Sequence, residues 1–120
     1  MKVILLKQRA QNLEVMDIDD DLATLKSLIG CHSIDITARM IGGKYYEIVC
    51  DDEGLLRKST ITALDLDNMS ILAGNLIITG EVDMDGALTS LTDEDIERIS
   101  ENTINVPVGD SSVMILSMSY

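Results

Sequence analysis

The spacing of hydrophobic positions changes several times along the chain, and each change predicts one structural element. The apolar run at residues 3–6 and the partly alternating segment 13–18 flank a polar stretch, which predicts a β-hairpin. Three aspartates then precede residues 22–29, where Leu and Ile recur at the spacing of one helical face. The acidic N-cap and Gly30 at the far end therefore predict a short helix.

The central part of the chain has the pattern of a second hairpin. Apolar and polar side chains alternate over residues 33–39, and Gly42-Gly43 separates this run from the strand-like segment 44–50. The Asp-Asp-Glu-Gly sequence at 51–54 predicts a further turn. We interpret residues 55–70 as a loop with some strand.

The last third of the chain predicts one more helix between strands. Residues 75–80 are a strand candidate, and the sequence Asp-Met-Asp-Gly at 83–86 predicts a turn. Thr92 and the three acidic residues after it are typical of a helix start. Pro107 lies in a polar segment that we interpret as a turn, and residues 113–116 form a final apolar strand.

Together these elements predict a small α+β fold with one core. We expect residues 1–120 to form a single domain, in which a mostly antiparallel sheet of about six strands carries two short helices. The chain has no Phe or Trp, so aliphatic side chains and seven methionines must fill the core.

The net charge limits the classes of possible partner, and the lack of membrane-spanning and signal-peptide patterns indicates the compartment. With 21 acidic and nine basic residues, the formal net charge of −12 disfavours direct binding to nucleic acid or to an anionic membrane. No apolar stretch approaches the roughly 20 residues of a membrane-spanning helix, and the N-terminus lacks the pattern of a signal peptide. We therefore expect a cytoplasmic protein with reduced cysteines.

Several segments carry a resemblance to a known family. They are residues 3–6, Leu25–Gly30 (LKSLIG), Ile48–Leu56 (IVCDDEGLL), Ile71–Gly80 (ILAGNLIITG) and Leu88–Ile96 (LTSLTDEDI). In their order they resemble the domain of unknown function 3846 family, small proteins of phages and bacterial mobile elements. The resemblance covers residues 2–99, and we interpret 101–120 as a strand-containing extension. The resemblance implies that the gene lies among counter-defence genes and that the protein acts in the cytoplasm of the host cell if a phage encodes it. It supplies no known catalytic residue.

Candidate chemistry in the sequence is sparse. There is no G-x-S-x-G elbow, phosphate-binding loop or dinucleotide fingerprint, so we expect neither enzymatic activity nor a cofactor. Residues 81–86 imitate half of a calcium loop, but the closing glutamate position is Thr92, so we expect a solvated acidic turn and no metal. The residues Cys31, His32 and Cys50 are too few for a zinc site. Whether these three residues act beyond packing stays open.

Two binding hypotheses from different classes follow. In the first, the protein sequesters a small anionic host signal of the nucleotide type in a pocket built by a homo-oligomer, whose subunits pair through the C-terminal strand edge at 113–118. Its candidate ligand-binding residues are the clustered basic and tyrosine side chains Arg39, Lys44, Tyr45, Tyr46, Arg57 and Lys58.

In the second hypothesis, the protein is an acidic decoy. Its carboxylates imitate DNA phosphates and occupy a basic groove on a host restriction or regulatory protein. Three acidic clusters, at residues 19–21, 51–53 and 93–95, motivate it.

Overall fold

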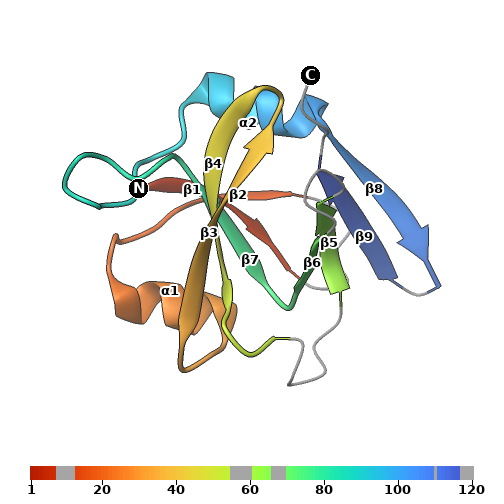
Figure 1. Ribbon diagram of the computed structural model, residues 1–120, viewed down its shortest axis with the longest axis horizontal. Coiled ribbons are helices and arrows are strands. Elements are labelled where there is room, and N and C mark those ends of the chain that lie inside the picture. The colour runs from red at the N-terminus through yellow and green to blue at the C-terminus, as the bar shows by residue number, and fades with distance from the viewer. Residues whose placement is uncertain (8–12, 55–60, 66–69, 110, 117–120) are drawn as a thin grey trace.

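The computed structural model describes residues 1–7, 13–54, 61–65, 70–109 and 111–116 of the 120-residue chain (Figure 1). The elements in chain order are β1 (Lys2–Leu6), β2 (Glu14–Asp17), α1 (Leu22–Ile29), β3 (Ile34–Ile41), β4 (Lys44–Asp51), β5 (Ile61–Asp65), β6 (Ser70–Ala73), β7 (Leu76–Thr79), α2 (Asp93–Glu101), β8 (Thr103–Val108) and β9 (Ser111–Leu116). Neither helix is long and apolar enough to cross a bilayer.

Five strands form the first sheet, called sheet A here. Its strand order is β2-β1-β7-β4-β3, and every pair is antiparallel. Both predicted hairpins are confirmed as the pairs β1–β2 and β3–β4. Gly42 and Gly43 form the tip of the second hairpin with φ of 62° and 84°, a backbone region that L side chains rarely adopt.

The other four strands form a second sheet, called sheet B. Its order is β6-β5-β9-β8, and β5 pairs with β9 in parallel while the other pairs are antiparallel. The α+β prediction is therefore confirmed, but the described chain has nine strands in two sheets where we expected about six in one.

The two sheets and two helices make a layered core around sheet A. On one face, Val3, Leu5 and Ile77 pack with Leu25 and Ile29 of α1. The opposite face meets α2 and the inner face of sheet B, through a second cluster that includes Ile4, Ile48, Leu76, Ile78, Leu72, Ile99 and Met114. Because sheet A is covered on both sides, its central strand β7 is buried at every position.

Both helices begin as their sequences predict, and α1 also ends at the predicted glycine. The Asp21 carboxylate accepts a hydrogen bond from Thr24 N at 2.7 Å, and Gly30 ends α1 in the left-handed conformation. At the start of α2, the Thr92 hydroxyl accepts from Asp95 N while the Asp95 carboxylate accepts from Thr92 N. This reciprocal capping box fixes the first turn of α2.

Two expectations for the C-terminal segment were wrong. Pro107 lies in strand β8 and not in a turn, because β8 is an edge strand of sheet B, where a missing N–H donor breaks no ladder. Strand β9 is not an edge, since β5 and β8 pair with its two sides. The described part of the predicted subunit-pairing edge is therefore already occupied within the chain.

Candidate functional site

A cleft of about 430 Å³ opens between the β3–β4 end of sheet A and strand β6 of sheet B. Its lining comes from β3, from the end of β4 with the turn after it, and from β6: Asp35, Thr37, Arg39, Cys50, Asp51, Asp52, Glu53, Gly54, Ile71, Leu72 and Ala73. The turn packs closely on β6, because a Cβ at Gly54 would lie 3.0 Å from the Ala73 carbonyl oxygen. The cleft therefore lies at the boundary between the two sheets.

The described lining of this cleft is acidic. Four carboxylates, from Asp35, Asp51, Asp52 and Glu53, share the lining with one guanidinium, that of Arg39. Arg39 Nη1 donates to the Thr37 hydroxyl and to the Ala38 carbonyl oxygen, so part of its donor capacity is used within β3. Such a lining favours a cationic guest over an anionic one.

A second hollow, of about 300 Å³, lies beside the first. It is lined by His32, Ser33, Asp51 and Glu53, and the last two residues also line the larger cleft. The Asp51 carboxylate accepts from Glu53 N at 2.9 Å, which holds the turn in shape. The acidic turn 51–54 therefore stands as a ridge between two hollows, with the side chains of Asp52 and Glu53 exposed.

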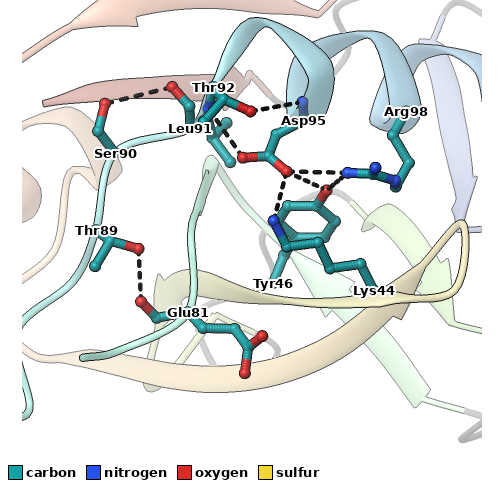
Figure 2. A network of polar contacts seen from close by, with 9 residues as sticks. All are labelled: Lys44, Tyr46, Glu81, Thr89, Ser90, Leu91, Thr92, Asp95 and Arg98. Carbon is teal, nitrogen blue, oxygen red and sulfur yellow. Dashed lines mark hydrogen bonds and ion pairs between the residues drawn. The ribbon is translucent and has the colours of Figure 1, made fainter. Parts of the chain in front are cut away.

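Lys44 and Tyr46, predicted as ligand-binding residues, instead belong to a polar network with helix α2 (Figure 2). Asp95 Oδ1 accepts hydrogen bonds from Lys44 Nζ and the Tyr46 hydroxyl, each at 2.8 Å, and from Arg98 Nη1 at 3.0 Å. Arg98 Nη1 also donates to the Tyr46 hydroxyl at 2.9 Å. The network ties the tip of the β3–β4 hairpin to α2.

Burial and hydrogen bonding set the protonation states of this network. Tyr46 is fully buried, and burial raises the pKa of its hydroxyl to about 12. Burial alone would raise the pKa of Asp95, but hydrogen bonds from Lys44, Thr92 N and Tyr46 outweigh it and hold that pKa well below the usual range. Asp95 is therefore an ionised, buried carboxylate that neutralises the cations around it.

Of the remaining predicted ligand-binding residues, Tyr45 is described, and it does not lie with Arg39. Tyr45 follows Lys44 along β4 and alternates onto the opposite face of sheet A from Tyr46, with 51% of its surface exposed. Arg57 and Lys58 lie outside the described residues. Of the six predicted residues, Arg39 is the one whose described position lines the cleft, while Lys44 and Tyr46 meet at the network.

Sequence reasoning missed Asp95 and Arg98 as the partners of Lys44 and Tyr46. A signal was present, because Asp95 is the third residue after the Thr92 cap and Arg98 follows three residues later, which places both near one side of α2. The alternation of β4 also separates Tyr45 from its two neighbours.

The two cysteines form no disulfide with each other and lie on opposite faces of sheet A. Cys50 is buried in the cluster on the α2 side, where burial first, and then nearby Asp35, raises the pKa of its thiol to about 11. Cys31 is half-buried against the cluster on the α1 side. The placement keeps the two sulfurs apart, and a thiol with so high a pKa is a poor nucleophile near neutral pH.

The calcium-like turn is closed by its own hydrogen bonds. Asp83 Oδ1 accepts from the backbone N–H groups of Asp85 and Ala87, at 2.9 and 3.0 Å. Within the described ranges, no group of three or more His, Cys, Asp or Glu side chains has the arrangement of a metal site.

Comparison with known proteins adds one finding. A family model, described as a domain of unknown function, matches residues 1–104, so that β9 lies beyond the matched part. No curated protein and no solved structure matches the chain. Since the match covers far more than half of the sequence, the chain belongs to the family of the domain of unknown function 3846 (DUF3846).

Proposed function

We propose that this protein is a non-enzymatic accessory protein of a phage or mobile element that binds a basic groove on a host restriction or regulatory protein. In this proposal the acidic ridge 51–54, with the hollows on its two sides, receives Lys or Arg side chains of the partner. The observation that carries it is the lining of the larger cleft, which contains four carboxylates and one arginine.

The distribution of ion pairs also supports an acidic binding surface. Lys2, Lys7, Lys44 and Arg98 each form an ion pair with a carboxylate of the same chain. These pairs engage basic side chains internally, so the net charge of −12 is carried largely by exposed carboxylates. A surface of one sign steers an oppositely charged protein toward it and raises the rate of encounter.

Not every acidic cluster remains available for a partner. Asp21 caps α1 and Asp95 is buried in the network with α2, so both carboxylates have structural roles. Asp52 and Glu53 are exposed on the ridge. The proposal therefore assigns the partner contact to the ridge and not to the acidic clusters at the two helix starts.

A pair of charge-matched double variants tests this assignment. Asp52→Asn with Glu53→Gln removes two charges from the ridge, whereas Asp19→Asn with Asp20→Asn removes two exposed charges that do not line the cleft. The tagged proteins are used to capture a partner from bacterial lysate, and the purified partner is then titrated with each variant against duplex DNA as competitor.

The decoy proposal expects the partner to be basic and to be displaced by DNA. It also expects affinity to fall when salt rises from about 0.1 M, because exposed charges are then screened within roughly 10 Å. The ridge variant should bind at least about tenfold more weakly than the control variant. Equal affinity of the two variants would reject the ridge as the contact.

The alternative proposal, sequestration of a nucleotide-type signal, has a separate outcome in the same experiment. Native mass spectrometry of the lysate-exposed protein would show an added nucleotide-sized mass, and Arg39→Glu would abolish it. That result, without a captured basic protein, would replace the decoy proposal.

A further inference from the structure

Strand β3 forms one edge of sheet A, and among the described strands only β4 pairs with it. The hairpin tip between them fixes which backbone groups of β3 point outward. In a hairpin with a two-residue tip, the pair that flanks the tip is hydrogen-bonded, and bonded and non-bonded pairs alternate from there. Here Ile41 and Lys44 flank the tip. The N–H and C=O groups that point away from β4 are therefore those of Ile36, Ala38 and Met40.

Two side-chain hydrogen bonds agree with this outward direction. Ile36 N donates to the carboxylate of Asp35 at 3.0 Å, and the Ala38 carbonyl oxygen accepts from Arg39 Nη1 at 2.9 Å. These two backbone groups are thus bonded by side chains of their own strand and not by a neighbouring strand. Local bonds of this kind compete with the bonds of a sheet ladder and can be exchanged for them.

The other three edges of the two sheets are short or interrupted. Strands β2 and β6 are four residues long, and β8 contains Pro107. Pro107 lies next to the pair that closes the β8–β9 hairpin, so it takes an outward position and removes a donor from that edge. Strand β3 is eight residues long, contains no proline and pairs with β4 in an unbroken register. Among the described strands it is therefore the edge best suited to receive another strand.

The side chains of β3 connect this edge to the acidic cleft. Asp35, Thr37 and Arg39 line the cleft, whereas Ile36 lies on the opposite, α1 side of the sheet. The ridge 51–54 follows the β4 residue that pairs with Asp35, so the carboxylates of the cleft lie toward the Asp35 end of β3. A strand added to β3 would place every second side chain over the cleft, beside these carboxylates.

We propose that the edge of β3 receives an extended segment of the basic partner as a sixth strand of sheet A. This inference rests on the proposed function and names how the partner is held. Backbone hydrogen bonds to the outward groups of β3 provide affinity, and alternate side chains of the segment provide specificity. Those over the cleft include Lys or Arg at the Asp35 end, and those on the other side are apolar and pack beside Ile36, which is 42% exposed. The net charge of −12 opposes the approach of a second copy, so the occupant is a basic chain.

Amide hydrogen exchange on the isotope-labelled full chain tests the proposal without altering the protein. The probe is the acetylated and amidated peptide Lys-Val-Thr-Val-Thr-Val-Lys, which has the same pattern in both directions and carries its charges on one face. With the peptide in large excess, exchange at Ala38 and Met40 should slow at least about fivefold, because their outward amides then donate to the added strand.

Ala38→Pro is the variant that blocks the edge. It removes an outward N–H and keeps every carboxylate of the cleft, and Pro107 shows that this chain accepts proline at an outward position of an edge strand. It should weaken peptide binding at least about tenfold, because the donor is lost and the ring obstructs neighbouring bonds. Ala38→Val is the matched control, since it adds similar bulk and keeps the N–H, and it should bind within about twofold of wild type. Circular dichroism checks the fold of both variants, and the exchange measurement on the wild type decides the question if Ala38→Pro does not fold.

Three results would overturn the proposal. The first is unchanged exchange at Ala38 and Met40 with the peptide in large excess. The second is equal binding by Ala38→Pro and Ala38→Val, which would place the contact in the cleft alone. The third is protection of the same amides that appears without peptide and grows with protein concentration, which would make a second copy the occupant.

The ridge variant separates this inference from the proposed function. If Asp52→Asn with Glu53→Gln binds the captured partner as wild type does, while Ala38→Pro loses it, the edge is supported and the ridge is rejected as the contact. If the ridge variant loses the partner and Ala38→Pro keeps it, the ridge is supported and the edge is rejected. Either proposal can therefore fail without the other.

Discussion

Replacing Asp95 by Asn should destabilise the protein by about 3 kcal/mol. The Asp95 side chain is 4% exposed, and its two oxygens accept from Thr92 N, Lys44 Nζ, the Tyr46 hydroxyl and Arg98. Breaking a buried ion pair typically costs about 3–5 kcal/mol. The lower end applies here because Lys44 and Arg98 are 46% and 31% exposed and regain water when the charge is removed.

The pH dependence of this difference identifies the ionised carboxylate as its cause. The pKa of Asp95 is lowered in the folded protein, so its contribution is fully present above the unfolded value of about 3.9. It is lost as the pH falls from there through the folded pKa. The difference between wild type and Asp95→Asn should therefore be constant above about pH 5 and shrink below pH 4.

Urea unfolding followed by circular dichroism measures both effects. We expect a lower midpoint with an unchanged m-value, and a Tm lower by roughly 10 °C. Asp93→Asn is the control, because Asp93 lies on the same turn, is 93% exposed and pairs with Lys2 at 3.1 Å, so its loss should cost less than about 1 kcal/mol. If the two variants lose equal stability, or if the Asp95→Asn difference does not change between pH 5 and pH 3, the reasoning is refuted.

Three further predictions follow from single residues. Tyr46 should ionise near pH 12 when absorbance at 295 nm is followed during a pH titration. Because its folded pKa is raised, its contribution to stability should be present below pH 10 and be lost as the pH rises through 12. Ionisation of all tyrosines near pH 10 would contradict this. Gly42→Ala should cost about 2 kcal/mol or more in urea unfolding, because its Cβ would lie 2.7 Å from the side chains of Arg98 in α2 and of Asn102, the C-cap of α2. Gly43→Ala meets no neighbour and should cost about 1 kcal/mol. At pH 8, a thiol reagent should label Cys31 well before Cys50, whose thiol pKa is about 11; equal rates would show that Cys50 is accessible.

Local signals in the sequence were sufficient to predict those elements that begin or end at a capping residue or a glycine turn. The Asp21 cap with Gly30, the Gly42-Gly43 tip and the Thr92 cap each act within a few residues, and the structure confirms all three. Strand β8 carried no such signal, because Pro107 is typical of turns and is acceptable in a strand only at an edge.

Nonlocal pairing explains the rest of what sequence reasoning missed. The division into two sheets depends on the parallel pairing of β5 with β9, whose residues lie about fifty positions apart, and no periodicity specifies that partner. The same holds for the network, in which Tyr46 on β4 meets Asp95 on α2. The sequence analysis predicted Lys44 and Tyr46 as ligand-binding residues, but it did not show that Asp95 of the same chain binds them.

The position of β9 between β5 and β8 sets an expected order of folding during synthesis. Every strand of sheet A has been synthesised once residue 79 is made, whereas sheet B cannot close until residues 111–116 are available to separate β5 from β8. Because chains fold from the N-terminus as they emerge, we expect sheet A with α1 to form first and to expose its second apolar face to the cell until α2 and β9 arrive. A nascent chain that stalls before β9 is made would therefore expose this apolar face for longest, and we expect it to aggregate or to bind chaperones.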